Sequence, residues 1–189
     1  LLDILEMAVE KGIPIILDIS LLDSRSALQL SSIIIGYFFR KNQEKFVGIN
    51  EKLNKIVFVV EEAQSVIGGS NNVAKFVELA KEGRKYQLGC IFITQQPRSI
   101  SKEILSQADN FFVFHLLSKS DLRALQEANA HYSNDILTQI LNEPIKGKAY
   151  MWSSNQPFVL LVQIINFEEY VRPNQAKEIQ KINNLLGPI

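Results

Sequence analysis

The sequence predicts an α/β fold with a mainly parallel sheet and an antiparallel extension at one edge. Two apolar, β-branched runs at 55–60 and 88–94 end abruptly in polar residues, as buried parallel strands do where they leave a sheet. Helical and strand-like patterns alternate along the chain, which favours parallel strands joined by right-handed crossovers. Ligands bind at the carboxyl edge of such sheets, so the polar strand ends are candidate site residues.

Composition fits one globular domain. The chain has 189 residues, of which 47% are apolar and 21% charged. Lys and Arg together equal Asp and Glu at 20 each, so the net charge neither favours nor excludes nucleic acid. Cys90 excludes an internal disulfide because it is the single cysteine, and it fits a reducing, cytoplasmic location. We interpret it as a core residue and not as a reactive thiol.

The first third of the chain predicts two helices and two strands. An amphipathic helix at 1–11 ends at Gly12, and Pro14 prevents its continuation. The opening without methionine, in what looks like the middle of a helix, suggests a fragment of a larger domain. We expect a strand at 13–19, a helix at 24–41, a polar connection at 48–54 and the strand at 55–60.

The remaining elements follow from caps, breakers and periodicity. Ser70 or Asn71 is expected to cap a helix at 72–85, and Ser120 to start another. Further expected elements are a strand at 88–94, a helical turn at 101–107, a strand at 110–116, a helix at 133–141, and strands at 148–152 and 158–165 joined by a turn at 155–157. No apolar run reaches the roughly 18 residues of a membrane span, and no signal peptide is visible.

Four ordered motifs resemble a known family. They are VFVVEEAQ at 57–64, AKEGRKY at 80–86, TQQP at 94–97 and LSQADN at 105–110. The set resembles the C-terminal half of the motor domain in the HerA-FtsK superfamily, nearest the HerA-type DNA translocases. This resemblance implies that residues 1–167 are the C-terminal part of a RecA-like P-loop NTPase core and that 168–189 form a polar arm or tail.

The chain contains no Gly-x-x-x-x-Gly-Lys-Ser/Thr motif, whose backbone cradles phosphates in P-loop enzymes. In the resembling family this loop would lie before Leu1. We therefore expect the 189-residue chain to be inactive alone.

The resemblance assigns three residues to a site for ATP and Mg²⁺. Glu62 would be the catalytic carboxylate, which orients and activates the water that attacks the γ-phosphate. Glu61 stands at the family's usual aspartate position, where its extra methylene shifts a magnesium site that prefers octahedral geometry. Gln95 would sense the phosphate, because its amide donates and accepts at once. The structural alternatives are a pair of acids capping a strand exit and a turn glutamine before Pro97.

Arg84 would be an arginine finger that reaches the nucleotide of a neighbouring subunit. The alternative is a cation favoured at a helix C-terminus. Basic residues exceed acidic ones locally and could line a hexamer interface or a DNA pore, or form a solvated face. They are Lys81, Arg84, Lys85, Arg98 and Lys102, against Glu82 alone.

The implied function is ATP-driven translocation of double-stranded DNA by a homo-hexameric ring, with a partner nuclease in DNA end processing or in defence, and without membrane contact. A conjugation or type IV secretion ATPase shares both motif strands and is an alternative. A second alternative is a non-catalytic interaction domain. Glu61, the missing P-loop and Gln96, which replaces a common arginine, favour that domain, whereas Glu62, Gln95 and Arg84 oppose it.

Overall fold

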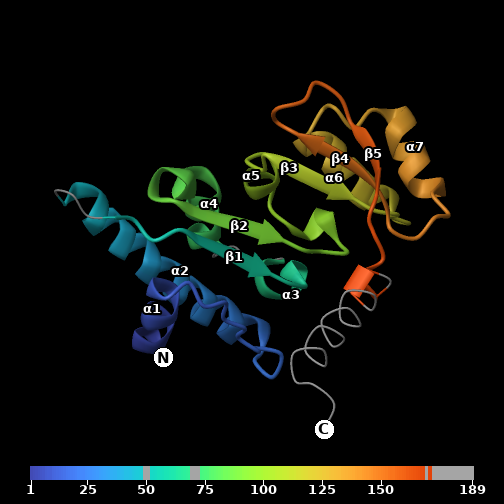
Figure 1. Cartoon of the computed structure of the whole chain (residues 1–189). Coiled ribbons are helices and arrows are strands. Elements are labelled where there is room, and N and C mark those ends of the chain that lie inside the picture. The colour runs from blue at the N-terminus through green and yellow to red at the C-terminus, as the bar shows by residue number, and fades with distance from the viewer. Residues whose placement is uncertain (49–51, 69–72, 169, 172–189) are drawn as a thin grey trace, which may run out of the picture. The chain divides into compact units, whose positions relative to one another are not determined.

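The computed structural model describes residues 1–48, 52–68, 73–168 and 170–171 (Figure 1). It separates into two compact units: the first is Leu1–Ala108 with Ser118–Ala130, and the second is Asp109–Leu117 with His131–Ile189. The first unit contains a parallel strand pair and the second an antiparallel sheet of three strands. The predicted α/β class is thus confirmed. The prediction of a mainly parallel sheet is wrong, since β1 and β2 form the one parallel pair among the described residues.

Most of the described helices belong to the first unit. Its elements are α1 (Leu2–Glu10), α2 (Ser24–Val47), β1 (Ile56–Val60), α3 (Ala63–Ile67), α4 (Ala74–Glu82), the 3-10 turn η1 (Gly83–Tyr86), β2 (Leu88–Phe92), the 3-10 turn η2 (Pro97–Ser99), α5 (Lys102–Leu105) and α6 (Lys119–Ala128). The short helix α3 was not expected from the sequence.

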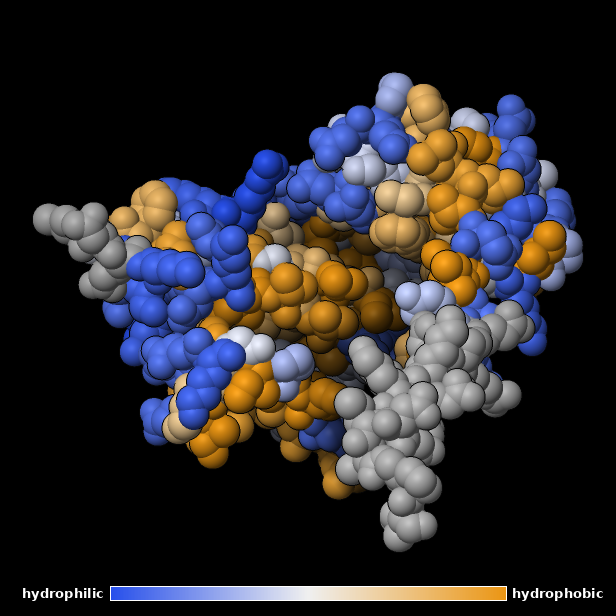
Figure 2. All heavy atoms as spheres, viewed as in Figure 1, coloured by the Kyte–Doolittle hydropathy of each residue, from blue (hydrophilic) through white to orange (hydrophobic). Residues whose placement is uncertain are grey.

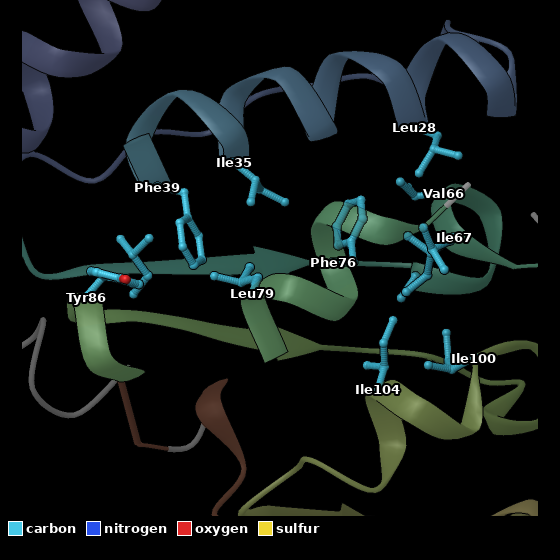
Figure 3. Packing of buried hydrophobic residues seen from close by; sticks show 13 residues of the cluster. Leu28, Ile35, Phe39, Val66, Ile67, Phe76, Leu79, Tyr86, Ile100 and Ile104 are labelled. Carbon is cyan, nitrogen blue, oxygen red and sulfur yellow. The ribbon is translucent and has the colours of Figure 1, made fainter. Parts of the chain in front are cut away.

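The pair of β1 and β2 lies at the centre of the first unit. Its register runs from Ile56 opposite Leu88 to Val60 opposite Phe92. Helices α2, α3 and α4 bury one face of the pair under an apolar cluster (Figure 3). The cluster includes Leu28, Ile35, Phe39, Val66, Ile67, Phe76, Leu79, Ile100 and Ile104. Each fully buried large side chain of this kind stabilises the fold by roughly 1.5–3 kcal/mol.

The other face of the pair carries exposed apolar side chains. Val57, Val59, Ile91 and Ile93, which we call the bare sheet face, are 48–61% exposed, and Figure 2 shows apolar residues gathered over β1 and β2. Parallel sheets are usually covered on both faces. The bare sheet face is therefore the side of this unit that is open to a further layer of polypeptide.

Asn42, on α2, fixes the starts of both strands. It is fully buried, and its Nδ2 donates to the carbonyl oxygens of Asn54 at 2.8 Å and Tyr86 at 2.7 Å. Its Oδ1 accepts the Asn54 N–H at 3.3 Å. Because Asn54 and Tyr86 each lie two residues before a strand, one side chain holds the entry to β1 beside the entry to β2.

The second unit consists of β3 (Asn110–Val113), α7 (Asn134–Asn142), β4 (Lys148–Ser153) and β5 (Leu160–Gln163). Strand β4 is central and pairs antiparallel with both neighbours, which confirms the predicted hairpin. Tyr132 is fully buried, and its hydroxyl donates to the carbonyl oxygen of Tyr150 at 2.9 Å. Phe111 packs edge-on against the Tyr132 ring, so aromatic contacts anchor this sheet.

Two strand predictions need correction. Residues 13–19, expected as a strand, form no ladder within the described residues, and Ile16 is 94% exposed. An apolar run needs a paired neighbour to become a strand, and no described segment pairs with it. Residues 110–113 form a strand as predicted, but they pair antiparallel with β4 and not within the parallel sheet.

Some predictions lie outside the described residues. They include the cap at Ser70 or Asn71 and, apart from residues 168, 170 and 171, the arm or tail at 168–189. No helix in the described ranges is long and apolar enough to cross a membrane.

We expect Asn42→Ala to lower the free energy of unfolding by about 2–4 kcal/mol, because each buried polar group left without a partner costs about 1–3 kcal/mol. Chemical unfolding followed by circular dichroism measures this loss. Asn142→Ala is the matched control, since exposed Asn142 also donates to a backbone carbonyl, that of Thr138, at 3.0 Å. The control should change stability by less than about 0.5 kcal/mol. Equal losses in the two variants would contradict the proposed role of Asn42.

Candidate functional site

Backbone hydrogen bonds extend the pairing of β1 and β2 beyond their last residues. The Ile93 N–H donates to the carbonyl oxygen of Val60 at 3.0 Å, and the Ala63 N–H donates to that of Ile93 at 2.9 Å. The polar residues after the two strands therefore leave the sheet at the same carboxyl edge. This is the edge at which open α/β sheets bind ligands.

Glu62 has a strained backbone at this edge. Its φ and ψ are both 47°, in the left-handed region that costs a residue other than glycine about 1–3 kcal/mol. Glu62 immediately precedes α3, and its carbonyl oxygen accepts the Ser65 N–H at 2.8 Å. Such strain tends to persist at functional sites, so the conformation of Glu62 marks it as a candidate functional residue.

The structure brings Glu62 and Gln95 into direct contact. Gln95 Nε2 donates to Glu62 Oε1 at 3.1 Å, although the residues lie 33 positions apart in the chain, and both are exposed. The predicted meeting of an acid and an amide at one sheet edge is thus confirmed. An exposed carboxylate beside an amide can take a proton from water while the amide orients a second oxygen ligand. The catalytic roles of these residues stay predictions.

Two further polar residues join this contact, and the sequence analysis gave neither a role. Gln64 Nε2 donates to Glu62 Oε2, and Thr94 Oγ1 donates to Gln64 Oε1 at 2.6 Å. Thr94 Oγ1 in turn accepts the Gln96 N–H at 3.0 Å. Both Gln64 and Thr94 are half-buried. Their positions within the VFVVEEAQ and TQQP motifs were the available signal, but the hydrogen bonds depend on tertiary contact.

Glu61 is exposed next to Glu62. The described part of the chain contains no group of three or more His, Cys, Asp or Glu side chains that could hold a metal ion. Mg²⁺ commonly takes one or two protein carboxylates and fills its other positions with water and phosphate oxygens. The carboxylate of Glu61 fits that donor chemistry.

Arg84 does not join the site within this chain. It lies in η1, which precedes β2, whereas Gln95 follows the other end of that strand. A five-residue strand spans roughly 16 Å, so Arg84 and Glu62 lie at opposite ends of the parallel pair. The Arg84 side chain is exposed.

Intramolecular contacts occupy part of the basic segment. Lys81 Nζ lies 3.0 Å from the Glu103 carboxylate, and Lys85 Nζ lies 5.2 Å from the ring centroid of Tyr86. Arg98 donates to a serine hydroxyl of α6 at 3.1 Å. The Lys81–Glu103 contact is a surface ion pair and contributes only about 0–1 kcal/mol, so Lys81 can exchange it for a contact with a polyanion.

Solved structures define the class of fold. The chain resembles the genome packaging NTPase B204 from Sulfolobus turreted icosahedral virus 2 in complex with AMPPCP, with a TM-score of 0.52 at 16% sequence identity. The match covers 69% of this chain and 62% of that one, and the structure of B204 with AMP gives the same TM-score. The similarity establishes a shared fold.

Curated sequences point to a particular family, and the resemblance predicted from the motifs is confirmed: the chain is related to HerA helicases. It is 30% identical over 132 residues to the DNA double-strand break repair helicase HerA of Sulfurisphaera tokodaii, covering 67% of this chain. The HerA of Pyrococcus furiosus is 28% identical over 117 residues. The matches span 26% and 21% of those relatives, about a quarter of their length. No protein-family model matches the chain.

Cys90, on β2 near the site, should react slowly. Burial raises the pKa of its thiol from 9.0 to about 11, so at pH 8 the reactive thiolate should be roughly 100-fold scarcer than in the unfolded chain. Iodoacetamide should therefore label the folded protein about 100-fold more slowly than the urea-unfolded protein. Comparable labelling rates would show that Cys90 is a reactive thiol after all.

Proposed function

We propose that this chain is part of an ATP-driven motor that moves double-stranded DNA. The observation that carries the proposal is the contact of Glu62 with Gln95 at the carboxyl edge of a parallel pair. Phosphoryl transfer to water needs a group that orients the nucleophile and a group that senses the γ-phosphate. An acid and an amide from adjacent strands can meet both needs in one pocket, in a RecA-like core.

Glu62 would accept a proton from the attacking water as the γ-phosphoryl group transfers. Its exposed carboxylate keeps Oε1 within reach of solvent, and the Gln95 amide can exchange its bond to Oε1 for one to a phosphate oxygen. Glu61 would hold Mg²⁺. When bound, the ion supplies positive charge that neutralises the phosphate oxygens.

The nucleotide also needs a phosphate-binding loop, which we propose comes from polypeptide outside these 189 residues. The bare sheet face supports this, because Val57, Val59, Ile91 and Ile93 offer an apolar surface on the very strands that carry the site. The curated relatives are about four times as long as the part that matches them. On this proposal the 189-residue chain by itself hydrolyses no ATP.

Arg84 would act between subunits of a ring, which we propose is a homo-hexamer. An exposed arginine at the end of the parallel pair away from Glu62 cannot serve its own nucleotide, but it can serve a neighbour's. The relatives named as DNA double-strand break repair helicases support DNA as the substrate. We propose in addition that the motor works with a partner nuclease in DNA end processing or in defence.

Glu62→Gln in the full-length gene product should lower ATP hydrolysis by at least about 100-fold, because the amide cannot accept the proton of the water. ATP binding should be unchanged, since the amide keeps the size and polarity of the side chain. Steady-state hydrolysis and equilibrium binding of a labelled ATP analogue measure the two effects separately.

Glu127→Gln is the control for this variant, because Glu127 is an exposed carboxylate on α6, a helix that carries no candidate site residue. It should leave both quantities unchanged. Parallel loss of binding and hydrolysis in Glu62→Gln would indicate a structural role and favour a non-catalytic interaction domain.

Arg84→Ala should lower hydrolysis by about 1000-fold, the scale of an arginine finger. Mixing these subunits with subunits that keep Arg84 but lack the P-loop lysine should restore activity, because one interface in the mixed ring is then complete. Lys102→Ala, also an exposed basic residue, should need no such rescue. A mixture that stays inactive would exclude action between subunits.

A further inference from the structure

We propose that Gln64 and Thr94 form a positioning relay that orients the Glu62 carboxylate and ties it to the strand that carries Gln95. The inference rests on the proposed function, because it assumes that Glu62 is the catalytic base. It concerns the hydrogen-bond chain that runs from the Gln96 N–H through Thr94 Oγ1 and Gln64 to Glu62 Oε2.

Chemistry fixes the direction of every bond in this chain. An ionised carboxylate only accepts, so the Gln64 amide must turn its Nε2 to Glu62 and its Oε1 to Thr94. The Thr94 hydroxyl must then donate to Gln64, and its lone pair is available for the Gln96 N–H. Every hydrogen bond of the relay therefore pairs one donor with one acceptor. The polarity of the relay is therefore set by the charge of Glu62.

The relay divides the work between the two carboxylate oxygens. Oε2 is held by Gln64, which is half-buried and bonded on both sides. Oε1 is held by Gln95, which is exposed and makes one bond to it at 3.1 Å. When the Gln95 amide turns to a phosphate oxygen, Oε1 becomes free to accept a proton from water, whereas Oε2 stays anchored.

Anchoring is needed because little else restrains Glu62. Its side chain is exposed and its backbone is in a strained conformation, so an unanchored carboxylate would sample several rotamers. A displacement of about 1 Å at a catalytic group can cost about 100-fold in rate. Gln64 and Thr94 touch neither water nor phosphate in this scheme, which makes them positioning residues.

The test uses the full-length gene product with Thr94→Val and Thr94→Ser. Valine keeps the shape of threonine and removes the hydroxyl, whereas serine keeps the hydroxyl. We expect Thr94→Val to lower kcat for ATP about 10- to 100-fold with the KM for ATP unchanged, and Thr94→Ser to retain most of the wild-type kcat. The KM distinguishes a misplaced base from a damaged binding site.

Gln64→Leu provides a second and independent variant. It should lower kcat to the same extent. The double variant Gln64→Leu with Thr94→Val should be no slower than either single variant, because both residues act through the same series of hydrogen bonds and either substitution interrupts it. Gln139→Leu, an exposed glutamine on α7, is the control and should match the wild type. Thermal unfolding confirms that each variant is folded.

The outcomes separate the relay from the proposed function. An active wild type with an unimpaired Thr94→Val, or with Thr94→Ser as slow as Thr94→Val, would overturn the relay and leave the motor function intact. Additive losses in the double variant would also overturn it. A wild type without ATPase activity, or a fully active Glu62→Gln, would overturn the proposed function and the relay with it.

Discussion

The pairing of β1 with β2 is the constraint on which the candidate site depends. Its register sets Val60 opposite Phe92, and two more backbone bonds carry the pairing through Ile93 to Ala63. Asn42 closes the opposite end by holding both strand entries. Since hydrogen bonds fix the strands at both ends, the side chains that leave the carboxyl edge have little freedom to drift apart. The contact of Glu62 with Gln95 is a consequence of that register.

The same pair is buried on one side only. Helices α2, α3 and α4 pack against its inner face, and the core there has the dense apolar contacts of an ordinary domain. The bare sheet face carries branched apolar side chains and no cover within the described residues. A structure of this kind supplies two layers of a three-layer arrangement. This asymmetry and the short span of the HerA relatives that the chain matches support the same proposal, in which further polypeptide completes both the layer and the nucleotide site.

The positions of the charged groups suggest that the two ends of the parallel pair have different roles. The acids and the amides gather at one end of the parallel pair, and Arg84 stands at the other. In a ring, this separation would let each subunit offer the Glu62 carboxylate to its own nucleotide and the Arg84 guanidinium to the nucleotide of the next subunit. The strain at Glu62 is consistent with this arrangement, because a left-handed residue turns the chain sharply after β1, where the Glu62 carboxylate meets Gln95. The relay through Gln64 would then hold the carboxylate where that turn places it.

The sequence alone determined the elements that local chemistry controls. The strands at 55–60 and 88–94, the polar residues that end them and the final hairpin all follow from periodicity and side-chain type. The helix expected to start at Ser120 also forms, but Ser118 caps it. Tertiary structure decided which strands meet. Residues 13–19 carry a strand pattern but have no described partner, and residues 110–113 pair with β4 because strand direction depends on contacts far along the chain. An apolar pattern predicts that a segment is buried, but it does not identify the segment that packs or pairs with it. For the same reason, the motifs indicated Glu62 and Gln95, whereas the link through Gln64 and Thr94 emerged only when two distant strands were placed side by side.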